Sequence, residues 1–381
     1  MNNIETVTKI FSKTILSTMK NFSIIASLIF IGLTINAYAC EGCIAHFGYE
    51  PTVEVATLWM NGTVQRLSDR RHDARANSVF VVESNVFVAG FEQNEQGNQV
   101  ATLWKNGIAQ RLSNGRHNAT ALSVFVYIDD IFVAGIEENE QGNQVATLWR
   151  NGVAQRLSDG RHSAGAISVF VSEENVFVVG REANAQGNHV ATLWKNGVAQ
   201  RLSDGRHNTG AISVFVFEGN VYAAGFEQDE QRNQVATLWR NGVVQHLSNG
   251  RHDPLASAGS VFVSEGNVFV AGIEQNERRR NVAMLWKNGN AQHLTGGNSH
   301  AMANSVFVSG GNVFVAGMEA NWGGDQVATI WRNGNDQRLS DEWRNRRIRS
   351  PGIISEEAAS VFVSEKGDVY VVGFGLCLLQ D

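Results

Sequence analysis

Residues 123–157 read SVFVYIDDIFVAGIEENEQGNQVATLWRNGVAQRL, and close copies of this stretch fill most of the chain. Two landmarks mark each copy, the Ser of SVFV and the Trp of VATLW, and both occur seven times, mostly 45 residues apart. The Ser copies are Ser78, Ser123, Ser168, Ser213, Ser260, Ser305 and Ser360. The Trp copies are Trp59, Trp104, Trp149, Trp194, Trp239, Trp286 and Trp331. A fixed period of this length predicts a repeat architecture in which each copy is one supersecondary unit.

Each copy contains four short runs with the composition of β-strands. In the quoted copy they span residues 123–126, 131–137, 144–149 and 153–157, and Gly, Asn and Asp separate them. An Asn-Gly pair stands between the third and fourth runs of every copy. It accepts the positive φ angles of a type I′ turn and so predicts a tight hairpin. The apolar runs are nearly continuous, which indicates sheets buried on both faces.

The two ends of the repeat region are complementary halves of one unit. The first copy has only a third and a fourth run, 54–59 and 64–68, and the last has only a first and a second, 360–363 and 368–374. Pairing these halves removes the exposed edge strands that an open array would leave. The sequence therefore predicts an all-β fold, a seven-bladed β-propeller of four-stranded antiparallel blades. Its closing blade takes two strands from each end of the chain.

The N-terminal region has the pattern of a secretory signal peptide. Lys20 precedes an apolar run over 22–35, and Ala37-Tyr38-Ala39 forms a small-x-small cleavage motif. We therefore expect residues 1–39 to be removed, with Met19 as a possible functional start. An N-terminal lead over 40–52, a propeller over 53–376 and a tail over 377–381 follow. We expect a secreted, periplasmic or cell-surface protein, and lipid attachment at Cys40 is the less favoured alternative to release.

The charge balance argues against nucleic acid as a partner. The whole chain has a net charge of −6, and removing 1–39 takes away Lys9, Lys13, Lys20 and Glu5, which leaves −8. A mildly acidic protein has no general attraction for nucleic acids or anionic membranes. We expect a monomer with no transmembrane helix after cleavage, no cofactor and no metal site.

The three cysteines suggest a clasp at the closing blade. Cys377 follows the last predicted strand and Cys43 precedes the first. Both should therefore lie near the seam, the place in the closing blade where the two ends of the chain meet. A Cys43–Cys377 disulfide would suit an oxidising compartment and would stabilise the fold by roughly 2–4 kcal/mol. A Cys40–Cys43 pair is the alternative.

The repeat resembles those of secreted bacterial β-propellers. VFVAG before a Trp-bearing strand is similar to kelch repeats, but each copy has one Gly (Gly90 or Gly135, for example) in place of the kelch double glycine. The Trp-Asp signature of WD repeats and the sialidase Asp-box are missing. The resemblance implies a fold and carries no activity.

A repeated Arg-His pair in the loop between blades is one candidate site. Its histidines are His72, His117, His162, His207 and His252, with His300 as a looser sixth copy. Because these loops lead into the innermost strands, the histidines are candidates for a ring around the central funnel that binds a metal or an anion. The simpler interpretation is that Arg and His hydrogen-bond to backbone carbonyls, and it is favoured.

The repeated Trp and the Asn-Glu-Gln-Gly-Asn loops have structural interpretations first. We expect the seven Trp to pack between blades, with sugar-stacking platforms as the alternative. The loops, for instance 94–98 and 139–143, resemble calcium loops only in composition and are interpreted as hairpin turns.

Departures from the repeat mark a second candidate site. The segment between Ser340 and Ser360 is about twice as long as its equivalent and is rich in Arg, and a neighbouring loop contains three consecutive Arg. Together they predict a basic, aromatic patch suited to carboxylate, sulfate or phosphate groups, unless they are merely solvated loops. The patch comprises Arg278, Arg279, Arg280, Trp322, Trp343, Arg344, Arg346, Arg347 and Arg349.

Three functions are compatible with these patterns. The favoured hypothesis is a non-enzymatic binding or scaffold propeller whose patch recognises an anionic polysaccharide or a protein. The second is a multivalent, lectin-like propeller with equivalent sites in each blade. The third is a hydrolase or lyase acting in the funnel, although no uniquely placed nucleophile or carboxylate pair supports catalysis.

Overall fold

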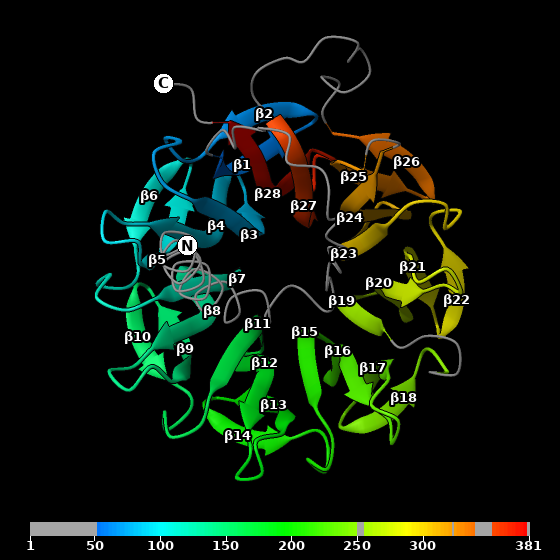
Figure 1. Cartoon of the computed structure of the whole chain (residues 1–381), viewed down its shortest axis with the longest axis horizontal. Coiled ribbons are helices and arrows are strands. Elements are labelled where there is room, and N and C mark those ends of the chain that lie inside the picture. The colour runs from blue at the N-terminus through cyan, green and yellow to red at the C-terminus, as the bar shows by residue number, and fades with distance from the viewer. Residues whose placement is uncertain (1–51, 250–254, 322–323, 340–352, 379–381) are drawn as a thin grey trace, which may run out of the picture. The chain divides into compact units, whose positions relative to one another are not determined.

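Seven four-stranded antiparallel sheets surround a common axis in the computed structural model (Figure 1). The structure describes residues 52–249, 255–321, 324–339 and 353–378. We name the blades A to G in chain order, with blade A formed by both ends of the chain. In every blade the first strand lies next to the axis and the fourth at the rim. The prediction of a seven-bladed β-propeller is therefore confirmed.

The strand bounds repeat from blade to blade. First strands are β27 (Ile353–Val363), β3 (Ala74–Val82), β7 (Ala119–Tyr127), β11 (Ala164–Ser172), β15 (Thr209–Phe217), β19 (Ala256–Ser264) and β23 (Ala301–Ser309). Second strands are β28 (Val369–Leu378), β4 (Asn85–Gln93), β8 (Asp130–Glu138), β12 (Asn175–Ala183), β16 (Asn220–Gln228), β20 (Asn267–Gln275) and β24 (Asn312–Ala320). Third strands are β1 (Thr52–Met60), β5 (Gln99–Lys105), β9 (Gln144–Arg150), β13 (His189–Lys195), β17 (Gln234–Arg240), β21 (Asn281–Lys287) and β25 (Gln326–Arg332). Fourth strands are β2 (Thr63–Arg66), β6 (Ile108–Arg111), β10 (Val153–Arg156), β14 (Val198–Arg201), β18 (Val243–His246), β22 (Asn290–His293) and β26 (Asn335–Arg338).

Blade A closes the ring as the half-units predict. Its strand order is β2-β1-β28-β27, and β1 pairs with β28 from Thr52 opposite Leu378 to Met60 opposite Tyr370. Asn61 also bridges the two ends of the chain, because its side-chain oxygen accepts a 2.9 Å hydrogen bond from the backbone N–H of Val369. Strand β28 continues through Leu378, two residues beyond the boundary expected from the sequence.

The first strands are longer than the SVFV runs suggest. In blade C the strand begins at Ala119, and its register with β8 shifts between Ala121 and Ser123, which is a β-bulge. The single Gly of the second strand lies opposite this bulge. A Cβ atom at Gly135 would lie 2.0 Å from the carbonyl oxygen of Thr120 and 2.8 Å from the indole of Trp149. Glycine is therefore required where the bulge and the Trp approach the same backbone.

The Asn-Gly pairs form the predicted type I′ turns. Asn106 has a φ of 52° and Gly107 a φ of 81°. The Asn side chain also ties this turn to the second strand, because its oxygen accepts a 2.8 Å hydrogen bond from the N–H of Val86. Asn is thus favoured both for the left-handed conformation and for this bond.

The hydrophobic core is divided among the seven interfaces between blades. Among the described residues, each interface has its own cluster of apolar side chains from two neighbouring blades. A Trp of the third strand is fully buried in every cluster. The expectation that the Trp residues pack between blades is confirmed, and their burial excludes them as sugar-stacking platforms.

The Ser of each SVFV run joins neighbouring blades in a closed ring of hydrogen bonds. The hydroxyl of Ser78 accepts a 3.2 Å bond from the N–H of Val124 in the next blade. The same contact recurs at Ser123, Ser168, Ser213, Ser260, Ser305 and Ser360. Each first strand is thereby attached to the next, and the seam in blade A is included.

A second closed ring is formed by the Phe of each SVFV run. Neighbouring ring centroids lie 4.6–5.1 Å apart and neighbouring planes differ by 46–57°. The members are Phe80, Phe125, Phe170, Phe215, Phe262, Phe307 and Phe362. Because each phenyl ring contacts both neighbours, the seven side chains encircle the axis and hold the inner strands together.

Several predictions concern segments outside the described residues. These are the signal peptide, most of the N-terminal lead, and both Cys40 and Cys43. Within the four described ranges every regular element is a strand, and no helix there is long and apolar enough to cross a membrane.

Candidate functional site

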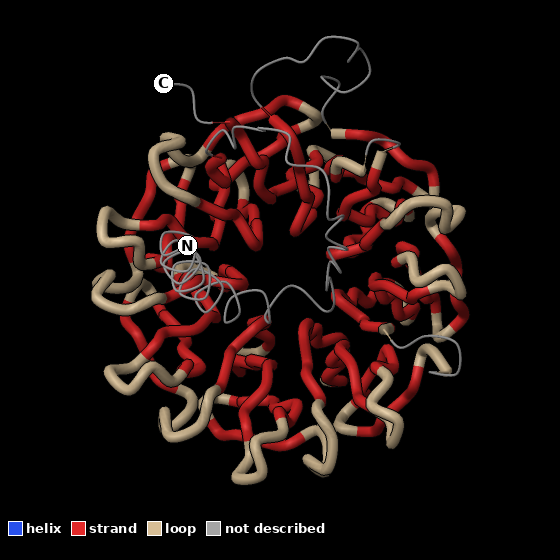
Figure 2. The backbone as a smooth tube through the Cα atoms, in the orientation of Figure 1, coloured by secondary structure: helices blue, strands red, loops and turns tan. Residues whose placement is uncertain are grey.

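The longer connections of each blade gather on one face of the disc, which we call the loop face. It carries the loop between the second and third strands and the loop that leads to the next blade. Figure 2 shows these connections as the long excursions at the periphery of the ring. The short Asn-Gly turns lie at the opposite ends of the third and fourth strands, on what we call the turn face.

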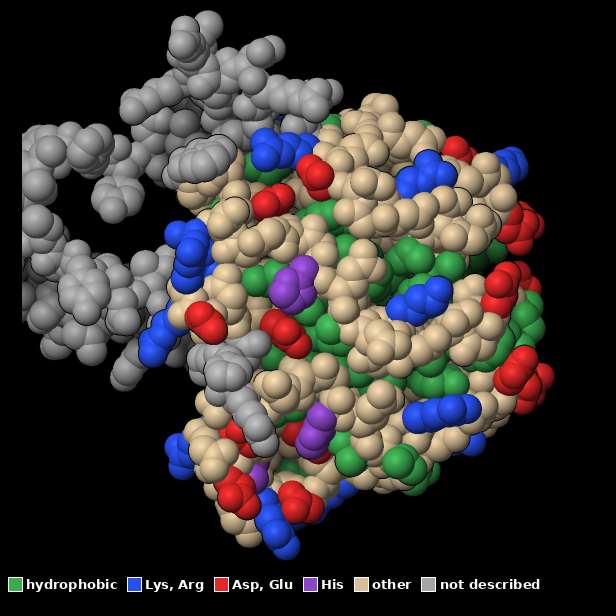
Figure 3. All heavy atoms as spheres, turned by 90° about the vertical axis from the view of Figure 1, so that its right-hand side faces the viewer, with side chains coloured by type: hydrophobic (Ala, Val, Ile, Leu, Met, Phe, Trp, Pro, Cys, Tyr) green, Lys and Arg blue, Asp and Glu red, His purple; other side chains and the backbone are tan. Residues whose placement is uncertain are grey.

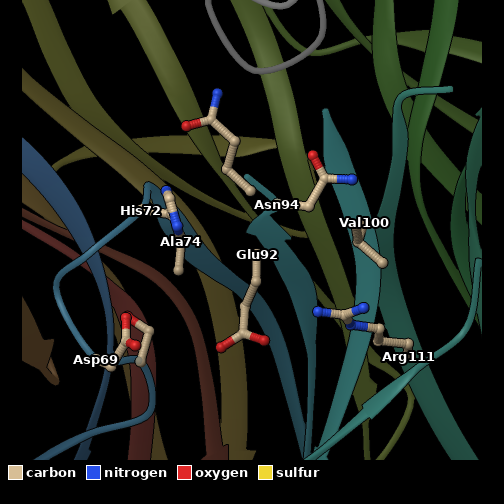
Figure 4. Close-up of a pocket in the computed structure, with 9 residues that line it drawn as sticks. Asp69, His72, Ala74, Glu92, Asn94, Val100 and Arg111 are labelled. Atoms are coloured by element: carbon tan, nitrogen blue, oxygen red, sulfur yellow. The ribbon is translucent and has the colours of Figure 1, made fainter. Parts of the chain in front are cut away.

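A polar pocket opens on the loop face where blade A meets blade B. Its cavity volume is about 140 Å³, and Asp69 and His72 line it from the loop between β2 and β3. Glu92 of β4 and Arg111 of β6 line it from blade B. In Figure 4 the Glu92 carboxylate lies between Asp69 and the guanidinium group of Arg111. The pocket is smaller than the roughly 300–1,000 Å³ typical of sites for drug-sized ligands, so it suits a small polar group.

Asparagine side chains hold the loops around this pocket in place. Asn94 accepts hydrogen bonds from the backbone N–H groups of Gln96 and Asn98, and it donates a 2.9 Å bond to the carbonyl of Gly115. Asn98 donates to the carbonyls of Gly115 and Arg116. The Asn-Glu-Gln-Gly-Asn segments are therefore hairpin turns fastened to the next loop, as expected, and their Asn oxygens already accept backbone hydrogen bonds.

The loop that carries the histidine is ordered in the same way. The Asp69 carboxylate accepts a 3.0 Å hydrogen bond from the backbone N–H of Arg71, and the guanidinium of Arg71 lies 3.7 Å from it. Asp159 and Asp204 make the equivalent contacts to Arg161 and Arg206. This Asx turn fixes the loop so that the following histidine reaches the pocket.

Burial in the pocket favours the protonated form of the central carboxyl. The pKa of Glu92 is raised, first by desolvation and then by the charge of Asp69, while Arg111 opposes the rise. The pKa of Glu182 is raised for the same reasons, with Asp159 adding to the rise and Arg201 and His162 opposing it. A half-buried carboxyl flanked by a cation is therefore a shared property of at least two interfaces.

The same residue types recur at fixed spacing in the other blades. The Glu stands two residues after the Gly that recurs in each second strand, and a basic residue follows the Glu 19 positions later, on the fourth strand. In the described part of the chain these pairs are Glu92–Arg111, Glu137–Arg156, Glu182–Arg201, Glu227–His246, Glu274–His293 and Glu319–Arg338. In the first four interfaces a His stands 20 residues before the Glu. The cavity is described at the first interface, and by equivalence we call each such set a Glu–base pocket.

Blade A departs from this pattern by exchanging two positions. In blade B the pair across the first and second strands is Ala74 opposite Glu92. In blade A it is Glu356 opposite Gly375, so the carboxyl comes from the first strand and the small residue from the second. Glu356 is buried. The seventh interface therefore keeps a carboxyl near this place but buries it within the closing blade.

The predicted histidine ring lies elsewhere than expected. His72 shares its pocket with Arg111 of the outermost strand, so its loop lies over the interface between two blades and away from the axis. His117, His162 and His207 stand at the equivalent positions of the repeat sequence, and His252 lies outside the described residues. No group of His, Cys, Asp and Glu within the described ranges has the geometry of a metal site.

His300 is not an equivalent copy of the other histidines. It immediately precedes Ala301 of β23, as Asp73 precedes Ala74 of β3. Its Nδ1 accepts a 3.2 Å hydrogen bond from the backbone N–H of Asn281, just as Asp73 accepts one from Glu54. Desolvation and the nearby Arg280 lower the pKa of His300, in keeping with an imidazole that acts as an acceptor.

The predicted arginine patch is only partly within the described residues. Arg278 and Arg279 are exposed on the loop between β20 and β21. Arg280 is half-buried and donates to the backbone carbonyl of Asn298, where it replaces the clamping Asn of other blades. Trp322, Trp343, Arg344, Arg346, Arg347 and Arg349 lie outside the described residues. The patch as a whole stays a prediction.

The cysteine prediction also remains open. Cys377 is buried in β28 against Val53 and Val55 of β1. Its position at the seam agrees with the expected location of a clasp. Because Cys43 lies outside the described residues, the Cys43–Cys377 bond stays a prediction.

Comparisons with known proteins add no family to this description. No protein-family model matches the chain, and no curated protein matches it either. The fold and the site therefore define the class on their own: a seven-bladed β-propeller with a polar pocket on its loop face whose Glu and basic residue recur at the same spacing in the other blades. The recurring Glu and the base 19 residues later were visible in the sequence as a pattern with the period of the repeat.

Proposed function

We propose that this protein is an exported, non-enzymatic binding propeller that holds a polysaccharide through several equivalent contacts on its loop face. The recurrence of the Glu–base pocket at successive blade interfaces carries this proposal. Equivalent weak sites on one rigid body suit a polymer with a repeating unit. Engaging several of them at once raises the overall affinity by roughly 10² to 10⁴ over a single site.

The chemistry of each pocket matches hydroxyl groups. A carboxylate only accepts hydrogen bonds and a guanidinium only donates them, whereas a sugar hydroxyl does both. Glu92 and Arg111 line one cavity, so together they offer an acceptor and a donor to neighbouring hydroxyls. Asn94 and His72 of the same cavity add further polar groups. Because the pocket contains both an acidic and a basic group, its affinity depends less on the charge of the ligand than the affinity of an arginine cluster would.

The surface as a whole supports recognition by local hydrogen bonding. Figure 3 shows Lys and Arg side chains interspersed with Asp and Glu on one side of the disc. The whole chain has a net charge of −6. Long-range attraction of an anionic polymer is weak on such a surface.

The experiment measures retention on immobilised dextran and immobilised polygalacturonate, a neutral and an anionic polysaccharide. The test variant carries R111Q, R156Q and R201Q. The control carries K105Q, R150Q and K195Q, which remove the same charge from the turn face of the same three blades. We expect the test variant to lose at least about tenfold in affinity, consistent with several lost charge-assisted hydrogen bonds, and the control to bind normally. Equal retention of both variants would overturn the proposal.

A second candidate ligand is an anionic glycan or a protein bound by the arginine patch. The exposed Arg278 and Arg279 support it, because guanidinium groups bind carboxylate and sulfate in a bidentate manner. It predicts that replacing Arg344, Arg346 and Arg347 with Ala abolishes binding to polygalacturonate while binding to dextran is unchanged. Unaltered binding to polygalacturonate would exclude it.

A further inference from the structure

The Glu–base pockets are not identical in their basic residue. In the described residues the base is Arg at four interfaces, namely Arg111, Arg156, Arg201 and Arg338, and His at two. The two histidines, His246 and His293, belong to the consecutive blades E and F. An Arg side chain carries its charge at every physiological pH, whereas histidine changes charge between about pH 5 and pH 8. The basic position on the fourth strand therefore differs in its response to pH between the two kinds of pocket.

His246 occupies the place and makes the contact expected of the base. Its Nε2 lies 3.0 Å from a carboxylate oxygen of Glu227, and their side chains are 54% and 21% exposed. One ring nitrogen thus faces the carboxylate, and the half-exposed ring leaves the other available to solvent or to a ligand. Arg111 stands in the same register on β6, opposite Thr102, as His246 does on β18, opposite Thr237.

Protonation changes what the second ring nitrogen can do. In neutral imidazole one nitrogen donates and the other accepts, but in imidazolium both donate. When one nitrogen donates to Glu227, the other is an acceptor in the neutral ring and becomes a donor once the ring is protonated. Only the protonated form reproduces the donor-only character of the Arg in the other pockets.

Two carboxylates and two basic side chains surround His246. Glu227 faces it from β16. By equivalence with the pocket between blades A and B, Asp204 and His207 approach from the loop between β14 and β15. Arg206 of that loop lies 3.2 Å from Asp204 and is mostly exposed. Because Glu227 lies within hydrogen-bond distance of the ring, a proton added to His246 has a carboxylate partner, while Arg206 is directed to solvent and His207 is a second imidazole.

We propose that the pocket of His246 is a pH-dependent binding site, which joins the four arginine pockets in holding the polysaccharide only when the imidazole is protonated. We assign the same role to His293, which stands in the same register on β22, opposite Met284. This inference rests on the proposed function. Acidification would raise the number of working contacts per chain, so the polymer would be held more tightly in an acidic medium. Because the two pockets are adjacent, the gain is confined to one sector of the loop face.

The experiment compares affinity for the same immobilised polymer between about pH 5 and pH 8, the range in which histidine changes charge. For the natural sequence we expect the affinity to fall about threefold to tenfold over this range, as two of several linked contacts are lost. The H246R/H293R variant should bind more tightly than the natural sequence at pH 8 and should show a clearly smaller fall between the two pH values, although His72 and its equivalents remain in the other pockets. The reciprocal variant R156H/R201H should show a steeper fall than the natural sequence.

The outcomes separate this inference from the proposed function. Loss of binding in the R111Q/R156Q/R201Q variant together with an unchanged pH profile in H246R/H293R would overturn the pH-dependent pockets alone. Binding that does not vary with pH in the natural sequence would do the same. Failure of the natural sequence to bind either polymer at any pH would overturn both. Circular dichroism and thermal unfolding of each variant at both pH extremes verify that folding is unchanged.

Discussion

The hydroxyl of Ser360 accepts a hydrogen bond of 3.4 Å from the backbone N–H of Val79, across 281 residues of sequence. The other six bonds of this ring measure 3.1–3.2 Å. The bond at the seam is thus the longest of the seven, and the Phe80–Phe362 centroid distance of 5.1 Å is the longest in the phenylalanine ring. The propeller is closed by the same contacts that join its other blades, with slightly looser geometry where the ends meet.

We expect S360A to destabilise the protein by about 1–3 kcal/mol, because it leaves the N–H of Val79 without this acceptor inside the ring. The matched control is S168A in the unbroken part of the ring, where the bond to Val214 measures 3.2 Å. Urea unfolding of both variants gives the free energies of unfolding. The longer bond at Ser360 gives no reason for a larger effect there. If S360A lowers the free energy of unfolding clearly more than S168A, the closing blade depends on this bond in a way that its geometry does not explain.

The single glycine of the second strand gives a sharper test of the bulge. In G180A the new Cβ would lie 1.8 Å from the carbonyl oxygen of Gly165 in the first strand. The backbone must then shift, and we expect a loss of about 3 kcal/mol or more, at the upper end of overpacking effects. G187A is the control, since Gly187 has a φ of 84° but nothing within 4 Å. It should cost about 1 kcal/mol, the ordinary penalty for alanine in that conformation. A tolerated G180A would show that the bulge can relax.

The sequence predicted the fold well because the repeat itself encodes it. The Asn-Gly turns and the half-units at both ends define four strands per blade and the closing blade at the level of the sequence. The extension of the first strand before Ser123 was missed, because Ala119 to Leu122 lack the strong β-composition of SVFV. That extension depends on a tertiary contact, the glycine opposite the bulge, which no local pattern reveals.

The site was predicted less well, for a physical reason. The rare departures from the repeat predict the arginine patch, most of which lies outside the described residues. The Glu–base pocket has no unusual composition, and its members are 19 or 20 residues apart, on two strands and an interblade loop. Their proximity follows from antiparallel pairing and from the fold of the interblade loop. The placement of His300 shows the same limit, because in a loop of equal length this histidine stands one position later than the others, where it meets a backbone N–H in place of the pocket.

The buried carboxyl of Glu357 should make stability depend on pH. Desolvation and the nearby charge of Glu54 raise its pKa, while Arg75 and a 2.9 Å hydrogen bond from Asn304 oppose the rise. A carboxyl with a raised pKa binds its proton more readily in the folded state. Its contribution therefore favours folding below that pKa and weakens folding as the pH rises through it.

We expect E357Q to raise the melting temperature at pH 7, because the amide keeps an acceptor for Asn304 without a buried charge. At pH values below the ordinary carboxyl pKa the variant and the natural sequence should be nearly equal in stability, since Glu357 is then protonated in both the folded and the unfolded state. E365Q, an exposed change in the same strand pair, should leave both values unaltered. A lower melting temperature for E357Q at pH 7 would mean that the carboxylate is stabilised by its neighbours more than burial destabilises it.

The pair formed by Arg75 and Glu54 tests whether charge at the seam contributes to closure. Their side chains are only 15% and 24% exposed, the guanidinium makes two contacts with the carboxylate, and it stacks 4.0 Å above the ring of Phe374. At the equivalent place between blades B and C, neutral Thr120 donates a 2.8 Å bond to Gln99. R75M should cost about 3 kcal/mol, because it leaves a half-buried carboxylate without its partner. T120V should cost about 1 kcal/mol, the usual value for a neutral hydrogen bond. R75K should recover only part of the loss, since lysine cannot bind the carboxylate at two points or stack on Phe374 as a planar group.

Unfolding rates give the decisive measurement. If the opening of blade A limits unfolding, R75M should increase the unfolding rate far more than T120V does. Equal unfolding rates for the two variants would place the limiting step elsewhere in the ring.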